Sequence, residues 1–182
     1  MEIKLTDSER LILANQYEIL GHLQDRKDHK LIAQQLRNGH EYLYRDALQV
    51  MSPAMTSGET DFVIDAISMY QALKKCYIKL GSPGDIDASK VEWPGFDGNN
   101  DAPFYQFTCA LAEDGQFVQE LGERGVNSHS PKVASYISML RKWNDLGRPQ
   151  TSMSSEQIKN LLQPTPKFML GIFQYQRPPV SK

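Results

Sequence analysis

The stretch that decides the fold is residues 59–80, ETDFVIDAISMYQALKKCYIKL. Its apolar residues follow the 3.6-residue period of an α-helix and cover half of the helical wheel, which is wider than the stripe of a surface helix. The other half carries acids near its start and lysines near its end, as the helix dipole favours: Asp61, Asp65, Ser68, Lys75 and Lys79. We therefore predict a central helix with one solvated side, capped by Thr56 and Glu59 and ended at Gly81.

Further helical patterns lie on both sides of this central helix. They occupy residues 6–23, two stretches within 25–51, and residues 101–114, 130–146 and 154–163. Thr6 with Glu9 and Ser154 with Gln157 are spaced as capping boxes at the starts of the first and the last of them. The segment 116–127 is expected to be irregular or briefly extended. The sequence thus predicts an all-α fold, a compact multihelical domain of about six to seven helices over residues 4–163, followed by a C-terminal extension, 164–182.

Length and composition are those of an ordinary globular protein. The chain has 182 residues, of which 40% are hydrophobic and 23% charged, and its net charge is −2. This balance does not favour a nucleic-acid partner, although it does not exclude one. No stretch approaches the roughly 18 apolar residues of a membrane span, and the N-terminus lacks the apolar part of an export signal. We therefore expect a cytoplasmic protein with no membrane partner.

The first helical pattern contains two amides at an unusual place. Gln16 falls near the middle of its predicted apolar arc, and Asn15 lies beside it. The apolar members of that arc are Leu5, Ile12, Leu13, Tyr17, Ile19, Leu20 and Leu23. A buried amide needs hydrogen-bond partners or costs about 1–3 kcal/mol. Asn15 and Gln16 are therefore either satisfied core amides or candidate residues of a binding site.

A long loop follows the central helix. Residues 81–100 show no regular pattern, and connections of this length are either functional or disordered. Trp93 and Phe96 are large apolar side chains that would be costly to leave in water. We therefore predict an ordered loop that places both side chains in the core, and we retain Trp93, Phe96 and the following Asp97 as candidate binding residues.

The end of this loop resembles the first half of a calcium-binding loop, because Asp97, Asn99 and Asp101 form a D-x-N-x-D sequence. The glycine and the bidentate glutamate that such a loop requires are replaced by Ala102 and Thr108. Asp101 is instead suited to cap the helix that follows it. We therefore predict no metal site and no cofactor.

The extension 164–182 does not have the composition of a flexible tag. Six large apolar residues lie between Phe168 and Tyr175, and they need a partner to leave water. The extension either wraps its own domain or reaches a neighbouring subunit. We favour the neighbouring subunit, because terminal segments that follow a finished domain are common in assembly contacts.

Several strings of this sequence are distinctive: ERLILANQY at residues 9–17, MYQAL at 69–73, GFD at 95–97, and GVN at 125–127 with its spacing from the helix of Trp143. Together they resemble the YfbU family of bacterial cytosolic proteins. The resemblance covers about residues 5–163. It implies a compact all-α fold that self-associates, and it implies no activity. The extension lies beyond the usual end of the family.

One pair of residues is compatible with catalysis. Arg124 and His129 occur as RGVNSH, which matches the R-x4-6-H spacing of HEPN-type ribonucleases. There the arginine would stabilise phosphate charge and the histidine would act as the general base. The alternative interpretation places Arg124 on the surface and His129 just outside the next helix. No nucleophile motif, phosphate loop or dinucleotide fingerprint is present in the sequence.

The expected function is therefore that of a non-enzymatic helical homo-oligomer, a homodimer or larger, that acts through macromolecular interaction. A further protein partner is compatible with this expectation. The alternative is a metal-independent HEPN-like ribonuclease that uses Arg124 and His129.

Overall fold

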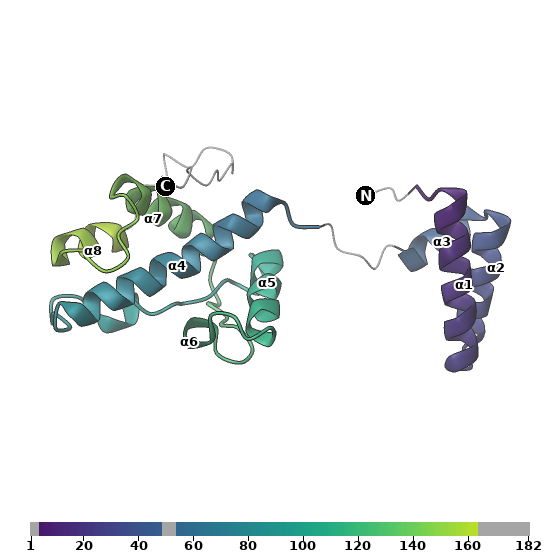
Figure 1. Cartoon of the computed structure of the whole chain (residues 1–182), viewed down its shortest axis with the longest axis horizontal. Coiled ribbons are helices and arrows are strands. Elements are labelled where there is room, and N and C mark those ends of the chain that lie inside the picture. Colours follow the sequence, from purple (N-terminus) through teal and green to yellow (C-terminus); the bar gives the residue numbers. More distant parts are fainter. Residues whose placement is uncertain (1–3, 49–53, 164–182) are drawn as a thin grey trace. The chain divides into compact units, whose positions relative to one another are not determined.

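The computed structural model describes residues 4–48 and 54–163. Contacts within the chain separate two compact units, which meet in sequence between Ala54 and Met55, and each is described here by itself. The described residues contain eight α-helices, one short 3-10 helix and no strand, which confirms the all-α prediction (Figure 1). The prediction of a single domain over residues 4–163 stays a prediction.

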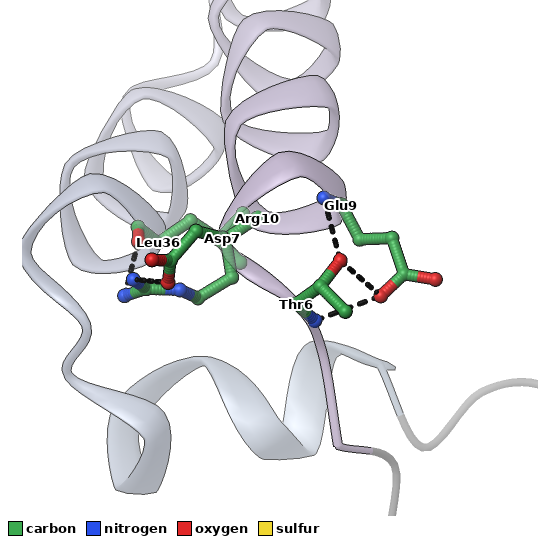
Figure 2. A network of polar contacts seen from close by, with 5 residues as sticks. All are labelled: Thr6, Asp7, Glu9, Arg10 and Leu36. Carbon is green, nitrogen blue, oxygen red and sulfur yellow. Dashed lines mark hydrogen bonds and ion pairs between the residues drawn. The ribbon is translucent and has the colours of Figure 1, made fainter.

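The N-terminal unit consists of α1 (Asp7–Leu23), α2 (Lys27–Asn38) and α3 (Glu41–Leu48). The predicted capping box at the start of α1 is present: the Glu9 carboxylate accepts the Thr6 N–H at 2.7 Å, and Thr6 Oγ1 accepts the Glu9 N–H at 3.3 Å. On the other side of the helix, Arg10 donates to Asp7 at 2.5 Å and to the Leu36 carbonyl of α2 at 3.4 Å (Figure 2). These bonds fix the first turn of α1 and tie it to α2.

The predicted helix at α1 is correct, but its predicted buried face is only partly correct: Leu5, Leu13 and Tyr17 pack against the core of the N-terminal unit, and the other members of the predicted arc do not. The buried residues of α1 are Ala14 and Gly21, which pack toward α2. A Cβ atom added to Gly21 would come within 2.7 Å of Lys30 Cγ, so α2 approaches α1 closely there. Small residues permit this close approach, and Leu13 and Tyr17 pack beside them. Four residues expected in the core are exposed: Ile12, Ile19, Leu20 and Leu23.

The C-terminal unit is built around α4 (Ser57–Lys79), which confirms the predicted central helix. Figure 1 shows α7 (Val133–Asp145) and α8 (Ser155–Leu162) on one side of α4, with α5 (Ala102–Glu113) and the short α6 (Val118–Leu121) on the other. The buried face of α4 includes Phe62, Val63, Ala66, Ile67, Met69, Tyr70, Ala72, Leu73 and Cys76. The predicted capping box of Thr56 and Glu59 is present at its start.

The prediction that Asp65 lies on the solvated side of α4 is wrong, because its carboxylate is buried. Arg148, from the loop after α7, donates to Asp65 Oδ1 at 3.2 Å and to Oδ2 at 2.5 Å. The same guanidinium stacks 5.1 Å from the centroid of the Trp143 ring. A planar guanidinium matches both carboxylate oxygens at once, so this charge can leave water without being left unpaired.

Two boundaries differ from those predicted. The segment expected to be irregular contains α6, which is only four residues long. The helix expected from residue 130 begins at Val133, because the preceding residues are held in a loop with His129 at φ 50°. The extension 164–182 lies outside the described residues, so the prediction about its docking is untested. No helix in the described ranges is both long and apolar enough to cross a bilayer.

Candidate functional site: the two-loop junction

The loop before α5 and the loop before α7 lie against each other in the C-terminal unit. We call residues 93–101 and 125–132 the two-loop junction. Phe96 and Asn127 form an isolated parallel bridge, and the Ser128 N–H donates to the Phe96 carbonyl at 3.0 Å. Gly95 has φ 85°, and a Cβ there would lie 1.9 Å from the Val126 carbonyl oxygen. The backbones therefore approach to a distance that only glycine permits at this position.

Asp97 is buried at the junction, and both of its carboxylate oxygens are engaged. Oδ1 accepts the Asn99 N–H at 2.9 Å, and Oδ2 accepts the Asn100 side-chain amide at 2.7 Å. Donation from the Asn100 amide is the main reason that the pKa of Asp97 is lowered, with the Asn99 N–H as the next contribution. The carboxylate thus organises the turn before α5.

Asp101 stands at the N-cap position of α5, as predicted, but its side chain does not cap that helix. Its Oδ2 instead accepts the Lys132 N–H at 2.8 Å and the Asp97 N–H at 3.4 Å. Lys132 precedes α7, so one buried carboxylate connects the starts of α5 and α7. The sequence pattern showed the carboxylate next to α5 but could not show that α7 begins beside it.

These contacts bear on the resemblance to a calcium loop. The carboxylate of Asp97 faces neighbouring amides, and that of Asp101 faces backbone N–H groups. Within the described ranges, no three His, Cys, Asp or Glu side chains gather in a group that could hold a metal ion. The two acids therefore act as hydrogen-bond acceptors that shape the loops.

Trp93 and Phe96 are buried, which confirms that the long loop is ordered by its aromatic residues. The Trp93 ring stacks on Tyr136 with centroids 5.2 Å apart, and Phe96 packs edge-on against the same tyrosine. Tyr136 also donates its hydroxyl to the Gly95 carbonyl at 2.6 Å. Burial raises the pKa of Tyr136, so the hydroxyl remains a neutral donor. These side chains form core, and their surfaces are covered by protein.

Arg124 and His129 are both exposed and lie on the loop between α6 and α7. The His129 N–H donates to Asn127 Oδ1 at 2.9 Å, and the histidine lies near enough to Asp97 to lower its pKa slightly. No hydrogen bond or ion pair joins Arg124 to His129 in the described part of the chain. The backbone of His129 thus belongs to the junction, and the grouping of Arg124 with His129 in one site stays a prediction.

Asn15 and Gln16 lie on α1, in the N-terminal unit, and both are exposed. Asn15 Oδ1 accepts from Arg37 Nη2 at 2.9 Å, and Arg37 also pairs with Glu18. The interpretation of these residues as core amides is therefore wrong, because the buried face of α1 is centred on Ala14 and Gly21 and not on Gln16. Gln16 lies among exposed aliphatic side chains.

A shallow cavity of about 310 Å³ lies between α7 and α8, and sequence reasoning did not predict it. Six residues line it, and it is mostly their apolar atoms that face the cavity: Lys142, Asp145, Leu146, Glu156, Gln157 and Asn160. The Lys142 amine is engaged at its edge, donating to the Asn160 and Gln163 carbonyls at 2.8 Å each. No sequence motif marks these residues, because the cavity arises only when the two helices pack.

Comparison with known proteins identifies a family whose members resemble this chain over most of its length. A model of the YfbU domain matches residues 3–164. A UPF0304 protein of Methanocaldococcus jannaschii is 31% identical over 166 residues, which cover 87% of this chain and 98% of that protein. A UPF0304 protein of Mannheimia succiniciproducens is 25% identical over 163 residues, covering 88% of this chain and 99% of its own length. Neither name states an activity, a ligand or a partner.

Proposed function

This chain belongs to the YfbU family, and we propose that it is a non-catalytic cytoplasmic protein that self-associates and acts by binding other macromolecules. The observation that carries this proposal is the distribution of exposed apolar side chains. Of the twelve large hydrophobic residues exposed in the described ranges, eight belong to the N-terminal unit: Leu11, Ile12, Ile19, Leu20, Leu23, Leu31, Tyr42 and Leu43. Apolar side chains that gather on one small unit are typical of an interaction surface.

The two-loop junction supports the non-catalytic part of this proposal. Its buried carboxylates accept hydrogen bonds from neighbouring amides and backbone N–H groups, and its aromatic side chains are packed in the core. A catalytic site requires polar groups directed at a substrate. The junction's polar groups are directed at one another, and no contact in the described residues favours the HEPN-like alternative.

The test is a measurement of mass and of binding on the full chain. Light scattering should give a mass above the 20.7 kDa of a single chain. Tagged protein should retain a specific partner from a bacterial lysate both with and without nuclease treatment. A monomeric protein that cleaves RNA, and that loses this activity in Arg124→Ala and His129→Ala variants, would overturn the proposal.

A further inference from the structure

Helix α1 has apolar residues on two opposite sides. Ala14 and Gly21 pack toward α2. Ile12, Gln16, Ile19 and Leu23 follow one another at intervals of four, three and four residues, and we call these four residues the α1 seam. At 100° per residue they form a narrow stripe on the side of α1 away from Ala14. Figure 2 shows the same division one turn earlier, where Arg10 is turned toward α2 and Glu9 away from it.

The aliphatic side chains of the α1 seam are accessible in the N-terminal unit. Ile12 and Ile19 are each 57% exposed, and Leu23 is 79% exposed. A single exposed leucine needs no explanation, but four residues in register along one helix form a continuous stripe. Leu20 borders this stripe and is also exposed.

We propose that the α1 seam packs in parallel against the α1 seam of a second copy of this chain. The inference rests on the self-association in the proposed function and names the surface responsible for it. Residues spaced alternately by four and three occupy the a and d positions of a coiled coil, where helices meet through a strip this narrow.

Gln16 favours a second copy over an apolar helix of another protein. In a parallel pair, the residues at equivalent positions face each other, so the two Gln16 amides can hydrogen-bond to one another. Against a purely apolar partner helix, the same amide would be desolvated without a hydrogen-bond partner. One polar residue within an apolar seam therefore specifies both the partner and the register.

Charge does not oppose the pairing of two identical units. Residues 4–48 contain seven acidic and seven basic side chains, so the N-terminal unit has no net charge apart from its histidines. Two copies of a neutral unit approach without long-range repulsion. Glu9 ends the apolar stripe, and its carboxylate is held by Thr6 in the capping box.

The exposed area indicates a weak dimer. Taking roughly 100 Å² for a fully exposed aliphatic side chain, Ile12, Ile19, Leu20 and Leu23 offer roughly 230 Å² of apolar surface per copy. Because slightly more than half of a typical interface is apolar, two copies would bury about 800 Å² in total. This area is at the low end for specific complexes, so dimerisation should depend on concentration in the micromolar range or above.

The experiment measures the mass of the full chain over a concentration series by sedimentation equilibrium. Ile19→Glu places a charge in the seam and should raise the dimer dissociation constant at least about 100-fold. Leu11→Glu is the matched control: Leu11 is 56% exposed on the same helix, but it lies about 100° around the helix from Ile12 and should leave the constant unchanged. Gln16→Leu should tighten association, because it removes a buried amide from the pair.

Circular dichroism shows that each variant is folded, and Leu23→Glu is a second seam variant if Ile19→Glu loses helical signal. If the wild type forms an oligomer and its dissociation constant is unchanged by Ile19→Glu, Leu23→Glu and Leu11→Glu, the α1 seam is not the interface. The proposed self-association would then still stand. A wild type that is monomeric at every concentration would overturn the self-association as well. Equal weakening by Leu11→Glu and Ile19→Glu would show that the interface lies across a different face of α1.

Discussion

Leu73 lies at the centre of the C-terminal unit and is completely buried on α4. Replacing Leu73 by alanine should lower the free energy of unfolding by about 2–5 kcal/mol, because the surrounding side chains cannot fully close the cavity. Lys75 lies two residues further along and is exposed, so Lys75→Ala should change the free energy of unfolding by less than about 0.5 kcal/mol. Urea unfolding of both variants measures the difference. Equal losses would contradict the assigned buried face of α4.

Asp97 makes stability depend on pH. Its pKa is lowered in the folded protein, mainly by the Asn100 amide, so the contribution is fully present above the unfolded value of about 3.9. That contribution should be lost as the pH falls from about 4 through the folded pKa. Asp97→Asn should therefore be less stable than wild type at neutral pH and should lose stability less steeply in acid.

Urea unfolding at several pH values between neutrality and acid measures this dependence. Glu123→Gln removes an exposed carboxylate and controls for the change in net charge. If Asp97→Asn and wild type lose stability in parallel below about pH 4, the Asn100 contact does not contribute to the acid sensitivity.

At the scale of elements, the loop from 81 to 100 acts as a packing element. Phe62 and Phe104 contact Phe96 from α4 and α5, with ring centroids 6.0 and 5.5 Å away. The loop thus joins the central helix to the helix that follows it, and Asp101 extends this connection to α7. Its position is determined by aromatic packing and by buried carboxylates together.

Phe96→Ala should therefore lower the thermal midpoint clearly, with a loss of about 3–5 kcal/mol from the cavity. Addition of calcium or of a chelator should leave the midpoint unchanged, because a ligand stabilises only a protein that binds it. Scanning calorimetry with each addition measures both effects. A rise in midpoint that grows with calcium concentration would show that Asp97, Asn99 and Asp101 bind the ion.

At the scale of the whole molecule, we predict that the extension 164–182 docks on a partner surface. If its six large apolar residues between Phe168 and Tyr175 docked, they would bury roughly several hundred Å² of apolar surface. If it docks on a neighbouring copy, deleting residues 165–182 should lower the mass in light scattering and keep the helical circular-dichroism signal. If it docks on its own chain, the deletion should lower the melting temperature at unchanged mass.

The two outcomes separate the extension from the α1 seam. The Ile19→Glu variant reports on the seam with the extension present, and the deletion reports on the extension with the seam present. A deleted protein that is unchanged in both mass and melting temperature would contradict the prediction that these apolar residues have a docking partner.

The sequence by itself determined the elements whose signals are local. Helical periodicity identified α4, and the three capping boxes of Thr6, Thr56 and Ser154 lie where predicted. Each box is made by residues three positions apart, so neighbouring residues contain all the information. The burial of Trp93 and Phe96 also followed from side-chain type, because aromatic rings of this size leave water wherever the fold permits.

The tertiary structure decided which of several compatible surfaces became buried. Ala14 and Gly21 are the buried residues of α1, because close helix packing selects small side chains there, while Leu13 and Tyr17 pack beside them and Ile12, Ile19, Leu20 and Leu23 stay exposed. Asp65 pairs with Arg148, which lies 83 residues further along the chain. Asp101 accepts the N–H of Lys132, which lies 31 residues further along, just before α7. Such contacts depend on which distant segments the chain path brings together, and no local pattern contains that path. The pairing of Arg124 with His129 in one site depends on such a path as well, and it stays a prediction.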